Sequence, residues 1–176
     1  MSEFSSSWLI RPAADEDVQG LLSRAGIGGW HAEVGNGWMV VVPRGGKSLA
    51  ELFHSVVISY EFGEDHGMWL RVYEDTMLIM SYECEFEEMD EDDIESGLSY
   101  VDYPDRSSAT ISELLGCDER ELISALEPQD FDEVLSINHT FMELLGIPPE
   151  LYEWISPEYL EDMDGNDNAF QEIKID

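Results

Sequence analysis

The stretch that decides the fold runs from Val56 to Phe86, where three β-rich segments follow one another: VVISYEF (56–62), MWLRVYE (68–74) and MLIMSYECEF (77–86). Short polar breaks separate them, at 63–67 and at Asp75-Thr76. Runs of β-branched and aromatic residues bounded by such breaks are typical of strands joined by tight turns. The segment therefore predicts an antiparallel β-meander.

The last of these segments alternates apolar and acidic residues. Tyr82, Cys84 and Phe86 interleave with Glu83, Glu85 and Glu87. Successive side chains of a strand point to opposite faces of its sheet. We therefore expect one face of the meander to be core and the other to carry carboxylates.

The N-terminal part predicts more sheet and two helices. The runs 30–34 and 38–42 flank Gly35-Asn36-Gly37, a pattern that favours a β-hairpin. A short strand is expected at 8–12 and a helix at 14–25. Ser48 and Glu51 fit a capping box, which predicts a short helix through Phe53.

The C-terminal half predicts helices over 109–115, 118–126 and 131–145, with another beginning at Ser156-Pro157. We therefore expect an α+β fold, with an antiparallel meander and hairpin sheet and a mainly helical C-terminal half. One domain, residues 1–176, is the simplest organisation. It would comprise a sheet-rich part (8–86), an acidic loop (87–97), a helical part (98–163) and a tail (164–176).

The layout also carries a resemblance. The strand meander, the acidic turn and the element Phe141-Met-Glu-Leu-Leu-Gly-Ile-Pro148 resemble a group of uncharacterised bacterial α+β proteins that end in F-x-x-L-L-G-[IL]-P. The resemblance covers residues 38–160. It implies a similar fold and brings no activity with it.

The charge excludes several classes of function. Forty Asp and Glu against eight Lys and Arg give a net charge of −32, well beyond the roughly 2 to 8 charges that keep a small domain soluble. Nucleic acids and anionic membranes are excluded as direct ligands, because neutralising phosphates requires clustered Lys and Arg. Adaptation to high salt is an alternative source of the charge, but threonine is scarce and glutamate outnumbers aspartate. With no signal-peptide or membrane-span pattern, we expect a soluble cytoplasmic protein.

No sequence motif for catalysis, cofactor binding or metal binding is complete. Arg44-Gly-Gly-Lys-Ser48 lacks the first glycine of a phosphate-binding loop, and 162–167 lacks the glycine and the final glutamate of a calcium loop. Cys84 lies between Glu83 and Glu85, which disfavours a thiolate. We therefore expect no catalytic residue, no cofactor and no metal site.

The distribution of charge points to a basic partner protein. No Lys or Arg occurs between Arg71 and Arg106, or between Arg120 and Lys174, and aromatic residues lie among the unopposed acids. The expected partner-binding residues are Glu83, Glu85, Glu87, Glu88, Asp90, Glu91, Asp92, Asp93, Tyr100, Tyr103, Tyr152, Trp154, Glu158, Tyr159, Glu161 and Asp162.

Three functional hypotheses remain. The first is a non-enzymatic inhibitor that neutralises a basic protein, in the manner of an immunity protein or antitoxin. The second is a DNA mimic that acts against restriction or defence proteins by occupying a nucleic-acid-binding groove. A phage is one source of such a protein. The third is a small enzyme, which would need a pocket with convergent polar groups.

Overall fold

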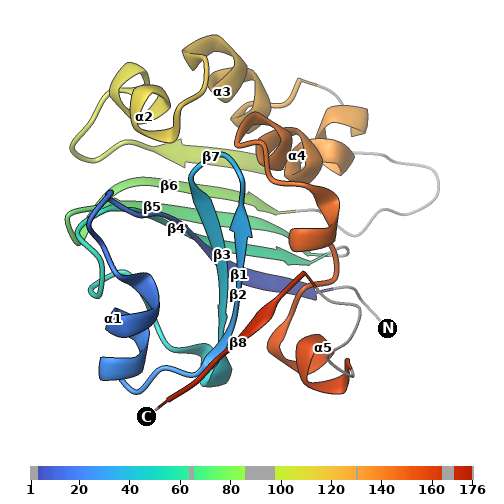
Figure 1. Ribbon diagram of the computed structural model, residues 1–176. Helices are drawn as coiled ribbons and strands as arrows, with labels where there is room; N and C mark the ends of the chain where they lie inside the picture. Colours follow the sequence, from blue (N-terminus) through green and yellow to red (C-terminus); the bar gives the residue numbers. More distant parts are fainter. Residues whose placement is uncertain (1–3, 64–65, 86–97, 130, 164–168, 176) are drawn as a thin grey trace.

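A computed structural model describes residues 4–63, 66–85, 98–129, 131–163 and 169–175 (Figure 1). Within these residues, eight strands form one antiparallel sheet in the order β7-β6-β5-β4-β1-β3-β2-β8. The strands are β1 (Phe4–Arg11), β2 (Gly29–Val34), β3 (Trp38–Pro43), β4 (Val56–Gly63), β5 (Gly67–Glu74), β6 (Met77–Glu85), β7 (Leu98–Asp102) and β8 (Gln171–Ile173). The α-helices are α1 (Val18–Arg24), α2 (Ser108–Leu115), α3 (Glu119–Leu126), α4 (Phe131–Leu144) and α5 (Pro157–Asp162), with 3₁₀ turns at Arg44–Gly46 and Pro149–Leu151. The fold is α+β, as the sequence predicts.

The predicted meander is confirmed. β4 pairs with β5 from Val56–Glu74 to Gly63–Gly67, and β5 pairs with β6 along its whole length. Between β5 and β6, Asp75 and Thr76 have φ of 49° and 68°, the two positive values that a two-residue type I′ turn requires. The hairpin of β2 and β3 is confirmed as well.

Other strands differ from the prediction. β1 begins at Phe4 rather than at Trp8 and lies inside the sheet, pairing with β4 on one side and β3 on the other. β7 and β8 are strands where the sequence predicted a helical part and a tail. These segments are short or serine-rich, so their own β propensity is weak and their backbone pairing depends on the strands beside them.

The helix predicted from Ser48 to Phe53 is wrong. The segment forms turns, and the Ser48 hydroxyl accepts a hydrogen bond from the amide of Ala50 at 3.3 Å rather than capping a helix. Leu49 and Phe53 are completely or almost completely buried. Both side chains belong to the smaller of the two cores that pack on the sheet.

The helix predicted over 109–115 implies a cap at Ser108, and α1 starts at Val18, four residues after its predicted start at 14. The Asp118 carboxylate accepts from the amides of Arg120 and Glu121, and the Ser156 hydroxyl accepts from Tyr159. The cap of α2 is Ser107 rather than Ser108. None of the helices in the described ranges combines the length and apolar composition needed to cross a membrane.

The two faces of the sheet are covered differently. Helices α2, α3 and α4 lie over one face, here called the inner face (Figure 1). Its core includes Leu9, Val40, Ile58, Leu70, Tyr82, Ile111, Leu122 and Phe141. On the opposite, outer face, α1 and the 48–53 turns bury a smaller core made of Ile10, Val18, Leu22, Ile27, Met39, Val41, Leu49, Phe53, Val57 and Ile173. This smaller core spans β1, β3, the start of β4 and Tyr73 near the end of β5, so it leaves the outer face of β6, β7 and the rest of β5 uncovered by described residues.

Side chains of the sheet fix the position of the helical layer. Arg11 of β1 donates a hydrogen bond to the carbonyl of Leu114 at 2.8 Å, at the C-terminal end of α2. Asn36, in the β2–β3 turn, donates to the carbonyl of Leu145 at 2.7 Å, just after α4. Both satisfy carbonyls that a helix end leaves without an intrahelical partner. The helices are therefore tied to the sheet by hydrogen bonds as well as by apolar packing.

We predict that Gly67→Ala destabilises the fold by about 2–4 kcal/mol. Gly67 has a φ of 139°, and a Cβ there would lie 2.0 Å from the carbonyl oxygen of Cys84. Gly35→Ala is the matched control, because a Cβ at Gly35 meets nothing within 4 Å. Urea unfolding of the two variants measures the difference; equal stabilities would contradict the close backbone approach.

Candidate functional site

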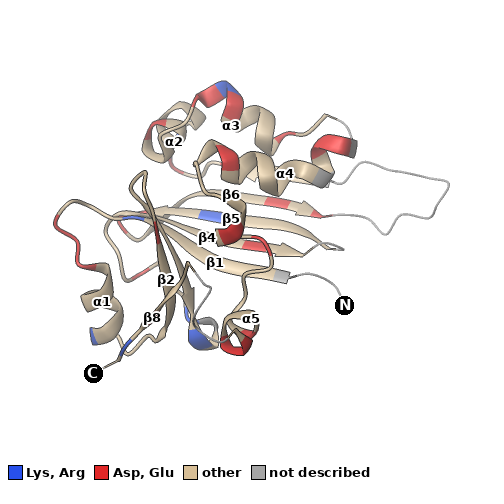
Figure 2. Ribbon diagram, turned by 45° about the vertical axis from the view of Figure 1, so that its right-hand side comes forward, with Lys and Arg blue, Asp and Glu red and all other residues tan. Residues whose placement is uncertain are grey.

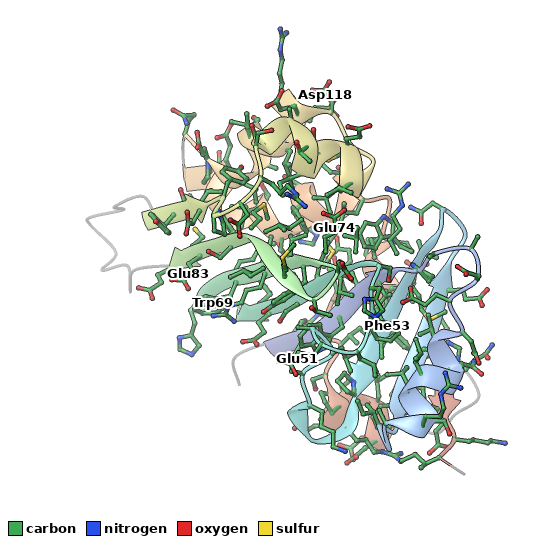
Figure 3. All side chains as sticks on the ribbon, turned by 90° about the vertical axis from the view of Figure 1, so that its left-hand side faces the viewer. Glu51, Phe53, Trp69, Glu74, Glu83 and Asp118 are labelled. Atoms are coloured by element: carbon green, nitrogen blue, oxygen red, sulfur yellow. The ribbon has the colours of Figure 1, made fainter. Side chains whose placement is uncertain are left out.

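A row of alternating aromatic and acidic side chains crosses the uncovered outer face. The strand pairings place Tyr100 opposite Glu83, Glu83 opposite Trp69, Trp69 opposite Glu61 and Glu61 opposite Ser6. Directly opposite residues of antiparallel strands point to the same face and touch one another. We call Tyr100, Glu83, Trp69 and Glu61 the aromatic–acid row. Figure 3 shows Trp69 and Glu83 side by side, on the side of the sheet away from the helical layer.

The surroundings of the row are acidic. Glu85 and Asp102 lie on the same face, next to Glu83 along β6 and next to Tyr100 along β7. The one cation there among the described residues is Arg71, whose guanidinium is 4.0 Å from the Glu83 carboxylate, with both side chains about half exposed. An exposed pair at that distance contributes little. The carboxylates of the row therefore remain available to an external cation.

Two glycines, both buried, flank the row on one side. Gly63 and Gly67 occupy the positions beside Glu61 and Trp69 on the same face, and they pair with each other. Because Gly63 and Gly67 have no side chains, β4 and β5 place no side chain against that side of the Trp69 ring on the outer face. Trp69 is partly exposed and Tyr100 is 63% exposed. Partly exposed Trp and Tyr side chains on a rigid sheet are typical of the hot spots of protein interfaces.

The C-terminal candidates meet this surface at the other end of the row. The amide of Ser6 donates to the carbonyl of Ile155 at 2.9 Å, which places the segment around Trp154 alongside β1. Trp154 is 51% exposed and Tyr159 is 41% exposed. The exposed acids Glu158, Glu161 and Asp162 lie on the adjoining α5 (Figure 2).

One acid of α5 already has a partner within the chain. The guanidinium of Arg44 lies 3.5 Å from Glu161 and 3.1 Å from Glu172, and it stacks over the ring of Trp30 at 4.5 Å. This arrangement, here called the Arg44 clamp, joins α5 to β8. Glu161 is therefore partly neutralised, unlike Glu158 and Asp162, which have no ion pair with any residue that the structure describes.

Two predicted aromatic residues are directed into the protein. Tyr152 is 3% exposed, and its hydroxyl lies 2.9 Å from Nδ1 of His139. Burial, followed by the charges of Glu153 and Glu143, raises the pKa of Tyr152 to about 12. Tyr103 packs against the inner-face core. The predicted acids Glu87, Glu88, Asp90, Glu91, Asp92 and Asp93 lie outside the described residues.

Sequence reasoning missed Trp69 and Glu61. The signal was present, because β4 and β5 alternate as β6 does. Applying the same period to the neighbouring strands places Glu61, Trp69 and Glu83 on one face. The register that makes them direct neighbours follows from the turns, above all the two-residue turn at Asp75-Thr76.

The two cysteines of the described residues are free thiols, Cys84 buried and Cys117 partly buried. Cys84 is completely buried on the inner face, and burial raises the pKa of its thiol. The pKa is raised, as the sequence predicts, but by burial, because Glu83 and Glu85 point to the other face. The described residues contain no group of three or more His, Cys, Asp or Glu that could hold a metal ion.

An acidic groove lies on the helical side. It has a volume of about 620 Å³ and is lined by Gly116, Cys117, Asp118, Glu121, Ser124, Ala125, Thr140, Glu143 and Leu144. Burial, with Glu121 and Asp118 nearby, raises the pKa of the Cys117 thiol. The groove thus offers carboxylates and a protonated thiol. It has neither a base poised beside a nucleophile nor an exposed aromatic ring.

His31 is a buried histidine that links α1 to the sheet. Its Nε2 lies 2.6 Å from Nε2 of Gln19, and its Nδ1 is buried without a hydrogen-bond partner. Burial lowers the pKa of His31 from its usual 6.5, an effect that Glu33 opposes in part. The imidazole is therefore neutral in the fold at neutral pH, and its Nε2 accepts a hydrogen bond from Gln19.

Comparison with known proteins adds no relative: no protein-family model, no curated protein and no solved structure matches this chain.

We predict that His31 makes the fold less stable as the pH falls below about 6.5. The unfolded chain binds the proton more readily than the fold, so acidification favours unfolding, by at most about 1.4 kcal/mol per pH unit. The stability advantage of the wild type over His31→Gln should shrink between pH 7.5 and 5.5, measured by urea unfolding at constant ionic strength. The exposed His66, changed to Gln, is the control and should follow the wild type. A pH-independent difference between wild type and His31→Gln would refute the assignment.

Proposed function

We propose that this protein binds a basic protein and neutralises it, as an immunity protein or antitoxin does, without catalysing a reaction. The observation that carries the proposal is the aromatic–acid row on the uncovered face of β4 to β7. Its rings and carboxylates come from four adjacent strands, so they are held in place before the partner arrives. A preordered surface loses less conformational entropy on binding than a flexible one.

The two kinds of side chain have separate tasks in this proposal. The net charge of −32 attracts a cationic partner over long range and speeds association. Trp69 and Tyr100 then supply apolar area and ring faces on which guanidinium groups stack, a contact of about 0.5–2 kcal/mol each. Glu83 lies between the two rings and Glu61 lies on the other side of Trp69, so both carboxylates can pair with the same cations. Inhibition follows when the covered surface of the partner is the one with which it acts.

The spacing of the carboxylates in the row favours binding to a basic protein over mimicry of DNA. Glu83 and Glu61 are separated by the strand that carries Trp69, so their backbones are two strand spacings, or about 9–10 Å, apart. A DNA strand carries one phosphate for every ~3.4 Å of helix axis. Alternating rings and acids suit separate Arg and Lys side chains better than a groove that tracks a continuous phosphate backbone.

The proposed place of action is the cytoplasm. Cys84 and Cys117 are both free thiols, which suits a reducing compartment. In that setting the protein would protect its own cell from a basic toxin.

We predict that the double substitution Glu61→Gln and Glu83→Gln weakens binding of the basic partner about tenfold or more. The partner is first captured at low salt from a lysate of the native host on the immobilised wild-type protein, then purified. Its affinity is measured by calorimetry, and its own activity is assayed with and without this protein.

The matched control is the double variant Glu113→Gln and Glu121→Gln, which removes the same charge from exposed positions of the helical layer. It should change the affinity about twofold or less, since distant exposed charges are screened by salt. Equal losses in both double variants would show that net charge alone drives binding. A captured protein whose activity is unaffected would refute inhibition.

A further inference from the structure

Trp154 has a backbone conformation that its side chain disfavours. Its φ is 61°, in the left-handed region where a bulky residue is a rare outlier. Two other non-glycine residues of the described chain, Asp75 and Thr76, share a positive φ, and they form the β5–β6 turn that requires it. Trp154 lies in the turn that follows the 3₁₀ turn at Pro149–Leu151, a place where a left-handed residue commonly ends a helical turn and where glycine or asparagine is usual.

The surrounding residues hold Trp154 in this conformation. Tyr152 and Ile155 are each 3% exposed, and both pack in the inner-face core. The Tyr152 hydroxyl is held by His139, and the carbonyl of Ile155 accepts from the amide of Ser6 in β1. With the chain fixed on both sides, the left-handed residue turns its side chain away from the core. The indole is 51% exposed as a result.

Among the described residues, no hydrogen bond or ring contact holds the Trp154 indole in place. Glycine adopts a positive φ without strain, and half of the ring surface faces solvent. Strain of this kind persists where it serves a function outside the fold itself. The position thus keeps a strained, exposed aromatic residue where a glycine would be better tolerated by the backbone.

The charges around the ring indicate the chemistry of its ligand. Glu150, Glu153 and Glu158 lie within four residues of Trp154, and no Lys or Arg occurs between Arg120 and Lys174. A ring face in such a negative field attracts a cation. The Arg44 clamp shows the same recognition inside this protein, with a guanidinium 4.5 Å from the Trp30 ring and carboxylates on two sides.

From this geometry we infer that Trp154 is a docking anchor for an arginine side chain of the basic partner. The inference rests on the proposed function and extends its surface, because the Ser6–Ile155 hydrogen bond places Trp154 beyond the Glu61 end of the aromatic–acid row. Arginine fits better than lysine, since its planar guanidinium stacks on an aromatic face and is weakly hydrated.

The first test measures the protein alone. Trp154→Gly relieves the strained φ, so its melting temperature should equal or exceed that of the wild type. A melting temperature lower by more than about 5 °C would show that the indole is a packing residue and would overturn the inference.

The second test measures preference for arginine. Fluorescein-labelled nona-arginine and nona-lysine carry the same charge, and their dissociation constants are measured by anisotropy at the same ionic strength. We expect the wild type to favour nona-arginine by about fivefold, Trp154→Gly to reduce that preference by about half or more, and Trp154→Phe to keep most of it. An unchanged preference in Trp154→Gly, or none in the wild type, overturns the inference.

The two proposals fail in different ways. If Glu61→Gln with Glu83→Gln leaves the captured partner bound as tightly as before, the aromatic–acid row is not the docking surface. If that double variant weakens binding and Trp154→Gly still keeps the arginine preference, the row stands and only the anchor is lost.

Discussion

Backbone pairing between β1 and β4 is the interaction on which the rest of the structure depends. It runs over eight residue pairs, from Phe4–Gly63 to Arg11–Val56, and it joins the meander of β4 to β7 to the group formed by β3, β2 and β8. Without it, the sheet would divide into two smaller sheets, neither able to cover the inner-face core. The serines at 5–7 contribute little apolar area, so that part of the join depends mainly on main-chain hydrogen bonds in a buried setting. Leu9 and Ile10, both completely buried, add apolar packing on the two faces of the other part.

The continuous sheet lets so acidic a chain fold. Strand alternation sends Tyr82 and Cys84 inward and Glu83 and Glu85 outward, so the core forms without burying a carboxylate. The acids then repel one another across solvent, where salt screens them. The same alternation brings rings and carboxylates of neighbouring strands into one row, so a requirement of folding also produces a surface suited to cations.

Local patterns predicted much of the fold, and the parts they missed depend on distant partners. Alternation and turn residues predicted β4 to β6 and the β2–β3 hairpin. β7, β8 and the first residues of β1 become strands only because another strand lies beside them. Of the candidate site, Glu83 and Glu85 lie on the uncovered face as alternation implies, whereas Tyr100 belongs to β7, a strand that the sequence did not predict. The burial of Tyr152 and the exposure of Trp154 could not be predicted from the sequence. The positive φ at Trp154 interrupts any regular alternation of buried and exposed side chains.

The unpaired edge of β7 has a consequence for how copies of this protein behave together. β7 pairs with β6 on one side, and its other edge has no strand beside it among the described residues. Such an edge is a template for joining another sheet. At neutral pH, mutual repulsion between highly charged molecules keeps copies apart. Near the isoelectric point of about 4.1 that barrier disappears, so we expect acid to drive edge-to-edge aggregation.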